Sequence, residues 1–177
     1  MPSIRIRILD EGETRASLPA LCAILSDCVE GGASVGFLSP YPPESAVPFW
    51  EAVADAAGEA ATVLFVAEVG GEILGTAQLG VKLPPNQSHR ADVKKLLVHR
   101  KARGLGLARR LMEAAEAEAL RRGRYVLVLD TATGSPAEAI YERFGWQRIG
   151  VIPRYALMPD GSFCGSTFFS KALDGAG

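Results

Sequence analysis

The sequence has little of what marks metal-binding, disulfide-rich or membrane-spanning chains. Its 177 residues include two histidines and three cysteines, and Cys22, Cys28 and Cys164 have neither metal-site nor disulfide-framework spacing. We therefore expect no metal, and reduced thiols point to a cytoplasmic protein. The longest apolar runs, such as residues 60–67, are too short to cross a membrane, so no membrane partner is expected.

The chain also lacks an excess of either charge. Its 19 basic and 20 acidic residues leave a formal net charge of −1, whereas nucleic-acid-binding proteins usually carry a basic excess or stripe. No nucleic-acid partner is therefore expected. The length is that of one domain, and no repeat, linker or low-complexity segment divides residues 1–177. We expect a single domain.

Residues 100–112 are the most informative segment. They place Gly104 and Gly106 between an apolar strand and an amphipathic helix predicted over 105–122. Such a turn offers backbone N–H groups and the positive end of the helix dipole to an anion, and glycine permits the backbone torsions required. An ordinary basic surface turn is the alternative. A pyrophosphate is the ligand we expect, and five neighbouring side chains add positive charge: Arg100, Lys101, Arg103, Arg109 and Arg110.

Hydrophobic periodicity predicts an alternation of helices and strands that is typical of one α/β domain. Helices are predicted at 14–29, 44–57, 105–122 and 135–143. Strands are predicted at 4–8, 61–69, 72–82, 88–98, 125–129, 146–155 and 163–172. Gly70-Gly71 indicates a hairpin. The strand at 125–129 is apolar throughout and is predicted to lie buried within the sheet.

This order of elements and motifs resembles the GCN5-related N-acetyltransferases (GNAT). Their Gln/Arg-x-x-Gly-x-Gly/Ala signature corresponds to Arg103, Gly106 and Ala108, and their tyrosine before a Gly-Phe pair corresponds to Tyr141 before residues 144–146. The resemblance implies an α/β (α+β) GNAT fold. That fold is a single mixed, mostly antiparallel sheet of about seven strands, with helices on both faces and splayed strands at the acetyl-CoA site.

The resemblance also implies an acyltransferase that moves an acetyl group from acetyl-CoA to a small-molecule amine, and often a homodimer. Residues 31–37, 90–93, 129–131 and 159–161 further resemble the tabtoxin-resistance acetyltransferases within this family, which acetylate an amino-acid-like β-lactam toxin. We therefore expect an amino-acid-like acceptor and toxin detoxification. Two alternatives remain, a protein or peptide N-acetyltransferase and a catalytically silent acyl-CoA-binding sensor.

The family pattern implies which residues bind the donor. Backbone groups of one strand would hold the pantetheine arm, and those of the glycine turn would hold the pyrophosphate. Many members carry an asparagine where this chain has Gly134, so the neighbouring Ser135 is expected to supply that hydrogen bond. The full set of expected donor-binding residues is Leu96, Leu97, Val98, Arg103, Gly104, Leu105, Gly106, Leu107, Ala108 and Ser135.

Acetyl transfer to an amine requires a proton acceptor, because an alkyl amine with a pKa of about 10 is protonated at pH 7. Asp92 and Asp130 lie beside the expected splay and are the candidates, acting directly or through water. Tyr141 is the candidate acid for the departing thiolate. The acceptor pocket is expected from residues 31–41, with Ser34, Phe37 and Tyr41 lining it, although core packing explains the two aromatic side chains equally well.

Overall fold

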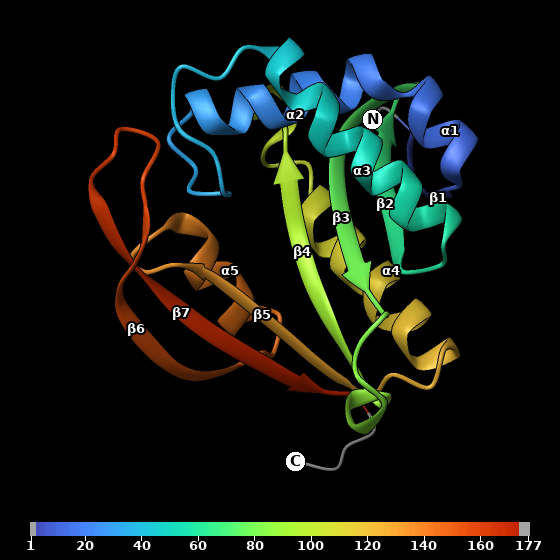
Figure 1. Ribbon diagram of the computed structural model, residues 1–177, viewed down its shortest axis with the longest axis vertical. Coiled ribbons are helices and arrows are strands. Elements are labelled where there is room, and N and C mark those ends of the chain that lie inside the picture. The colour runs from blue at the N-terminus through green and yellow to red at the C-terminus, as the bar shows by residue number, and fades with distance from the viewer. Residues whose placement is uncertain (1–2, 174–177) are drawn as a thin grey trace.

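A seven-stranded sheet runs through the molecule in the order β1-β2-β3-β4-β5-β7-β6 (Figure 1). The computed structural model describes residues 3–173. Every neighbouring pair is antiparallel except β4 and β5, which confirms the expected mixed sheet. The strands are β1 (Ile4–Leu9), β2 (Thr62–Val69), β3 (Glu72–Gly80), β4 (Arg90–Val98), β5 (Val126–Ala132), β6 (Gln147–Leu157) and β7 (Phe163–Ala172).

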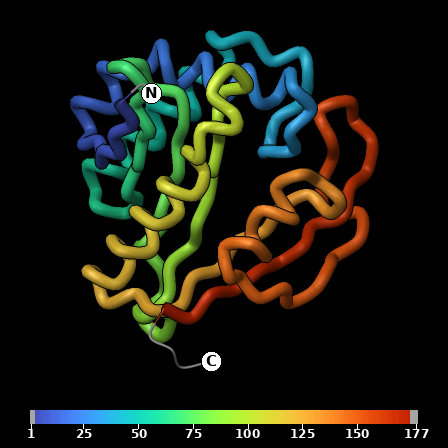
Figure 2. Tube along the Cα trace, turned by 180° about the vertical axis from the view of Figure 1, so that it is seen from behind, coloured from blue at the N-terminus to red at the C-terminus, as the bar shows by residue number. Residues whose placement is uncertain are grey.

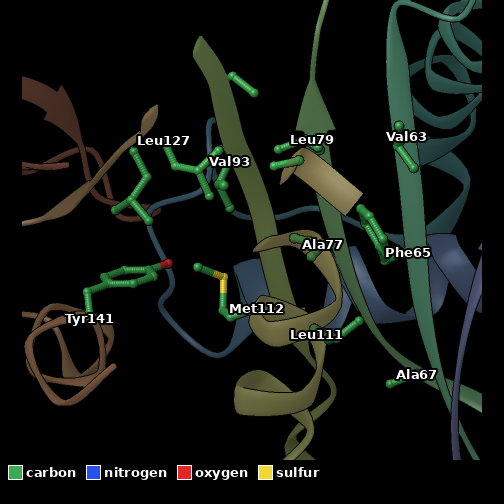
Figure 3. Packing of buried hydrophobic residues seen from close by; sticks show 14 of the residues in the cluster. Val63, Phe65, Ala67, Ala77, Leu79, Val93, Leu111, Met112, Leu127 and Tyr141 are labelled. Atoms are coloured by element: carbon green, nitrogen blue, oxygen red, sulfur yellow. The ribbon is translucent and has the colours of Figure 1, made fainter. Parts of the chain in front are cut away.

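Helices cover both faces of this sheet, as expected. One face carries α1 (Glu11–Ala16), α2 (Leu18–Glu30) and α3 (Val47–Gly58), and the other carries α4 (Leu107–Arg121) and α5 (Pro136–Arg143) (Figure 2). Two apolar clusters fill the spaces between helices and sheet. The cluster under α1–α3 contains Trp50, and the cluster under α4 contains Phe65 and Leu111 (Figure 3). No helix within residues 3–173 has the length and apolarity needed to span a membrane.

The predicted helix at 14–29 was wrong, because the structure has two helices that meet at Ser17. The first, α1, begins one turn earlier at a reciprocal cap in which Asp10 and Glu13 bond each other's backbone N–H groups. The second, α2, has Pro19 in its first turn, where a missing N–H costs nothing. Similarly, a 3₁₀ turn at Pro43–Ala46 replaces the start of the helix predicted at 44–57.

The strand predicted at 125–129 is β5, which lies between β4 and β7. Its burial was overestimated. Leu127 and Leu129 are buried under α4 and α5, but Val126 and Val128 are half-buried and Tyr125 lies outside the strand with 41% of its surface exposed. One face of β5 is therefore buried under helices, and the other is partly covered, with Asp130 as its exposed residue.

β4 and β5 separate soon after they meet. Their parallel pairing covers only three residue pairs and ends at Asp92 and Val128. Beyond that point, within the described residues, β4 pairs only with β3 and β5 only with β7, and the two strands diverge in a V (Figure 1). We call this divergence the β4–β5 fork. Backbone groups on its inner edges have no strand partner, which matches the expected splay.

Candidate active site

The turn before α4 presents free backbone amides beside the fork. Gly104 and Gly106 have φ values of +83° and +79°, in the left-handed region that favours glycine. No chain atom lies within 4 Å of the position that a Cβ would take at either residue. The N–H groups of residues 104–106 donate to no acceptor among residues 3–173, and the first-turn amides of α4 have no helical partner. This turn fits an anion such as a diphosphate.

Three of the five basic residues near this turn have protein partners. Arg100 donates to Asp27 at 2.9 Å and Lys101 forms an ion pair with Glu72. Arg109 stacks on the ring of Phe144 in α5, with 4.6 Å between its guanidinium carbon and the ring centroid. Arg103 and Arg110 are exposed and form no ion pair within the described chain. The positive charge left for a ligand therefore comes from these two side chains and the helix dipole.

In residues 96–98 the side chains pack into the core, while the backbone forms one edge of the fork. Leu97 is 2% exposed and packs under α1–α3, whereas Leu96 and Val98 pack against the cluster on the α4 side. Because this part of β4 lies beyond the fork, its backbone on the β5 side has no strand partner in the described chain. The side chains build the core, and the backbone on the β5 side faces the fork, although the Val98 carbonyl already accepts a bond from Cys28 Sγ at 3.7 Å.

Ser135 begins α5 and carries an unsatisfied buried hydroxyl. Its Oγ is buried without a hydrogen-bond partner and makes no capping bond. The neighbouring Gly134 N–H is already engaged, since it donates to Glu138 Oε2 at 2.6 Å. A buried polar atom left unpaired costs about 1–3 kcal/mol. The Ser135 hydroxyl therefore fits a bound ligand as its partner.

Tyr141 projects from α5 toward Met112 of α4 (Figure 3). It is 6% exposed, and its ring packs 5.6 Å from Phe169 and 6.1 Å from Trp146. Its hydroxyl forms no hydrogen bond to another described residue. Burial, and secondarily the charge of Asp130, raise the pKa of Tyr141 above its ordinary value, so the phenol stays neutral and able to donate.

The two candidate carboxylates lie on the same face of the sheet, away from α4. Asp92 is the last β4 residue paired with β5, and its partner there is Val128. Asp130 lies two residues beyond Val128 on β5. Asp92 forms an ion pair with Arg90, which occupies part of its carboxylate. Asp130 is exposed, accepts from Ser166 Oγ at 2.6 Å and has no cationic partner in the described chain. Of the two, Asp130 is the more available to an ammonium group.

The three residues expected to line the acceptor pocket differ in accessibility. Ser34 Oγ donates to the Leu157 carbonyl at 2.9 Å, so its hydroxyl joins the loop at 31–42 to β6. Tyr41 is 8% exposed and donates to the Ser45 carbonyl at 3.2 Å, which makes it a core residue. Phe37 is half-buried and packs 4.6 Å from Tyr41. Phe37 is the one of the three that offers a side-chain surface to a ligand.

Sequence reasoning missed Lys95 and Phe49. Lys95 lies on β4 beyond the fork, and its Nζ is 5.8 Å from the ring centroid of Phe37 and 5.5 Å from that of Phe49. The only signal in the sequence is the Lys94-Lys95 pair, which interrupts the alternation of the strand. That interruption is a β-bulge, at which Lys95 has a φ of +50°.

A cavity of about 360 Å³ lies apart from the fork, between the loop at 31–42 and the β6–β7 turn. Glu30 and Asp160 line it, and both already accept hydrogen bonds from this chain. These bonds hold the loop and the turn, and none of the individual residues predicted for the site lines this cavity. Within residues 3–173, no three His, Cys, Asp or Glu side chains are grouped so that they could hold a metal.

Comparison with known proteins identifies the family. The model of the Acetyltransferase (GNAT) family matches residues 19–146. An N-acetyltransferase of the hisH–hisA intergenic region of Azospirillum brasilense is 35% identical over 133 residues, which cover 73% of this chain and 76% of that protein. The chain belongs to the GNAT family.

Solved structures share the fold over nearly the whole chain. A ribosomal-protein-alanine N-acetyltransferase from Brucella melitensis is 26% identical with a TM-score of 0.77, and the alignment covers 96% of this chain and 99% of that one. YncA of Salmonella typhimurium, solved with acetyl-CoA, is 20% identical with a TM-score of 0.76, and the alignment covers 97% and 95%. The expected GNAT fold is thus confirmed.

Family membership defines the reaction class. The protein is an acyltransferase of the N-acetyltransferase type, and acetyl-CoA is its acetyl donor. The features of the fork suit this donor: free amides before α4, an unpaired strand edge and the unsatisfied Ser135 hydroxyl.

Proposed function

We propose that the protein transfers the acetyl group of acetyl-CoA to the amine of a small, amino-acid-like acceptor at the β4–β5 fork. The observation that carries this proposal is the unpaired strand edge at the fork, and the free amides before α4, the neutral phenol of Tyr141 and the carboxylate of Asp130 on β5 support it. Detoxification of a tabtoxin-type β-lactam is one use of such an activity, and the sequence segments described above support it.

Three parts of the chain bind the donor in this proposal. Backbone N–H groups of residues 104–108 hold the diphosphate, whereas the expected Arg103 N–H is already engaged because it donates to the Arg100 carbonyl at 3.3 Å. The free edge of residues 96–98 holds the pantetheine arm, and Ser135 Oγ donates to a polar atom of the donor. Bound acetyl-CoA supplies an acetyl thioester. An unpaired amide of β4 at the fork would stabilise negative charge on the reacting carbonyl. In enzymes from which one such donor has been removed, the activation free energy rises by about 3 kcal/mol.

Asp130 attracts the ammonium group of the acceptor and takes its proton, directly or through water. Asp92 is the weaker candidate because Arg90 neutralises its charge. Tyr141 donates to the departing sulfur. Its raised pKa makes full loss of the phenol proton costly, since a thiol has an ordinary pKa of about 8.5. Hydrogen bonding to sulfur is therefore the larger part of its contribution.

The loop at 31–42 supports a small acceptor over a peptide. It is fastened to the β6–β7 hairpin by Ser34 Oγ, and by Ser39 N–H, which donates to the Pro159 carbonyl at 2.9 Å. A peptide would have to pass between these attached segments. Acetylation of a protein N-terminus is the second candidate, favoured by the similarity to the ribosomal-protein-alanine N-acetyltransferase.

We also infer a homodimer formed through β6. This strand is at the sheet edge, is 11 residues long and exposes Ile149, Val151, Ile152 and Tyr155. Pro153 and the register shift between Ile152 and Ala156 interrupt the outer edge of β6, so we infer contact through these exposed apolar side chains, which pack self-complementarily on a second copy across a two-fold axis. Sedimentation equilibrium tests this inference: Val151→Lys should give a monomer, and an unchanged mass would contradict it.

Two further properties are part of the proposal. The continuous seven-stranded sheet supports a single N-acetyltransferase domain over residues 1–177. All three cysteines are unpaired, which supports a cytoplasmic location.

The test of the proposed function is release of free CoA from acetyl-CoA with a panel of amines. The panel contains amino acids, aminoglycosides, tabtoxin-type β-lactams and peptides with a free N-terminus. Turnover on amino-acid-like acceptors, but not peptides, is expected. Peptide acetylation alone would favour the second candidate, and tight acetyl-CoA binding without turnover on any amine would indicate a silent acyl-CoA sensor.

A further inference from the structure

A β-bulge sets the position of Lys95. The pairing of β3 with β4 shifts register between Thr76 and Gln78, and Lys95 is the β4 residue that adopts a φ of +50°. The buried hydroxyl of Thr76 fixes the bulge by donating to the Lys95 carbonyl at 3.0 Å. A lysine in the left-handed region is strained. Bulges beside active sites commonly re-aim one side chain, and here that side chain is a cation.

The Lys95 ammonium lies among aromatic rings and has no counter-ion. Its Nζ lies over the rings of Phe37 and Phe49, which are 5.4 Å apart. Lys95 forms no ion pair within residues 3–173. Cation–π contacts offset only part of the free energy that desolvation of an ammonium costs. An anion bound beside Nζ would supply the missing partner.

Burial lowers the pKa of Lys95, with Lys94 lowering it further and Asp130 on β5 opposing the shift. The β4–β5 pairing ends at Asp92 and Val128, so Lys95 lies three residues beyond it on β4 and Asp130 lies two residues beyond it on β5, on the two strands that form the fork. Lys94 is exposed and lies along Gly80 of β3, so it is not part of the aromatic site. A ligand with an ammonium group and an anionic group could therefore meet Asp130 and Lys95 at the same time.

We propose that Lys95 binds the carboxylate of the acceptor, so that the acceptor class is a free amino acid or a close analogue with an intact carboxylate. The inference rests on the proposed function, because it assigns the carboxylate site of that same acceptor. Asp130 then faces the amine, Lys95 faces the carboxylate, and Phe37 and Phe49 contact the apolar part between them. Lys95 determines specificity and takes no part in bond making.

The test compares each L-amino acid with its α-carboxamide as acetyl acceptor, measured by free CoA release. The two members of a pair carry the same side chain and differ in the charge that Lys95 would bind. Because the carboxylate also raises the pKa of the neighbouring amine, kcat/KM is compared per unprotonated amine, from pH profiles of both acceptors. The unaltered protein should prefer the acid in kcat/KM by about 10- to 100-fold, the range for a hydrogen bond to a charged group. Lys95→Met should abolish this preference, mainly by raising KM for the acid, and leave the amide unchanged.

Two control variants isolate the charge. Lys95→Arg keeps a cation and should retain most of the preference, and Lys94→Met removes the neighbouring exposed cation and should leave it intact. Thermal unfolding and acetyl-CoA binding of each variant establish that fold and donor site are preserved. Acetylation of amines with no preference for the acid, or an acid preference that survives Lys95→Met, would overturn the inference alone. Failure to acetylate any amine would overturn the proposed function and this inference together.

Discussion

The unsatisfied hydroxyl of Ser135 permits a prediction in which stability and affinity move in opposite directions. In the free protein, Ser135 Oγ is buried and unpaired, and removal of such an atom relieves a desolvation penalty at the low end of about 1–3 kcal/mol. Ser135→Ala should therefore stabilise the free protein by about 1 kcal/mol. Loss of a helix cap does not oppose this gain, because the side chain makes no capping bond.

The donor affinity should fall in the same variant. A hydrogen bond from Ser135 Oγ to bound acetyl-CoA is worth about 0.5–1.5 kcal/mol, so its loss weakens binding by about 2- to 10-fold. Calorimetric titration with acetyl-CoA measures this change. Thermal unfolding of the variant without ligand should show a rise in Tm of about 2–4 °C. This is the shift expected when a domain of this size gains about 1 kcal/mol in its free energy of unfolding.

Ser26→Ala is the matched control. The Ser26 hydroxyl is also buried, but it donates to the Tyr41 carbonyl at 2.7 Å. Its removal leaves that carbonyl unpaired and should lower stability by about 1 kcal/mol, with no change in acetyl-CoA affinity. If Ser135→Ala instead behaves like Ser26→Ala, losing stability at constant affinity, the assignment of Ser135 to the donor site is wrong.

Three further predictions concern chemistry and stability. Tyr141→Phe should lower kcat while acetyl-CoA affinity in calorimetry stays within about twofold, since the hydroxyl has no protein partner; an unchanged kcat would remove Tyr141 from the reaction. Asp130→Asn should lower kcat/KM by about 10²- to 10⁴-fold and flatten its rise with pH, more than Asp92→Asn does, and a normal pH profile would make Asp130 structural. Hydrogen bonds from Arg121 and then Arg122 lower the pKa of Glu118 below 4.5, so its stabilising contribution is present above that pH and is lost as pH falls through the folded-state pKa. Urea unfolding of Glu118→Gln should therefore show less loss of stability on acidification than the unaltered protein does, and equal loss would refute the assignment.

Local features of the site could be predicted from sequence. The turn at Gly104 and Gly106 was predictable because its left-handed torsions favour glycine and the helix after it has an evident apolar face. Tyr141 was predictable from its place before residues 144–146. The break at Ser17 carried local signals as well, namely Pro19 and the Asp10–Glu13 cap, which the periodic apolar pattern outweighed.

Features that depend on distant strands could not be predicted. The direction in which the Lys95 side chain points depends on a β-bulge that arises only when β3 and β4 pair. Ser34 looked available to a substrate because its partner, the Leu157 carbonyl, lies far along the chain. Asp92 is less available to a ligand than Asp130 because it forms an ion pair with Arg90. Arg90 and Asp92 are two positions apart on β4, and their side chains meet on one face only once the strand has formed.

The proposed reaction depends on backbone amides before α4 that hold the diphosphate of CoA. The most direct measurement is a calorimetric comparison of CoA with pantetheine, which lacks the diphosphate, on the unaltered protein and on Gly106→Trp. We predict that the unaltered protein binds CoA far more tightly than pantetheine. The variant, with its fold verified by thermal unfolding, should lose this advantage because an indole fills the open space above the turn. An equal preference for CoA over pantetheine in both proteins would show that these amides do not hold the diphosphate.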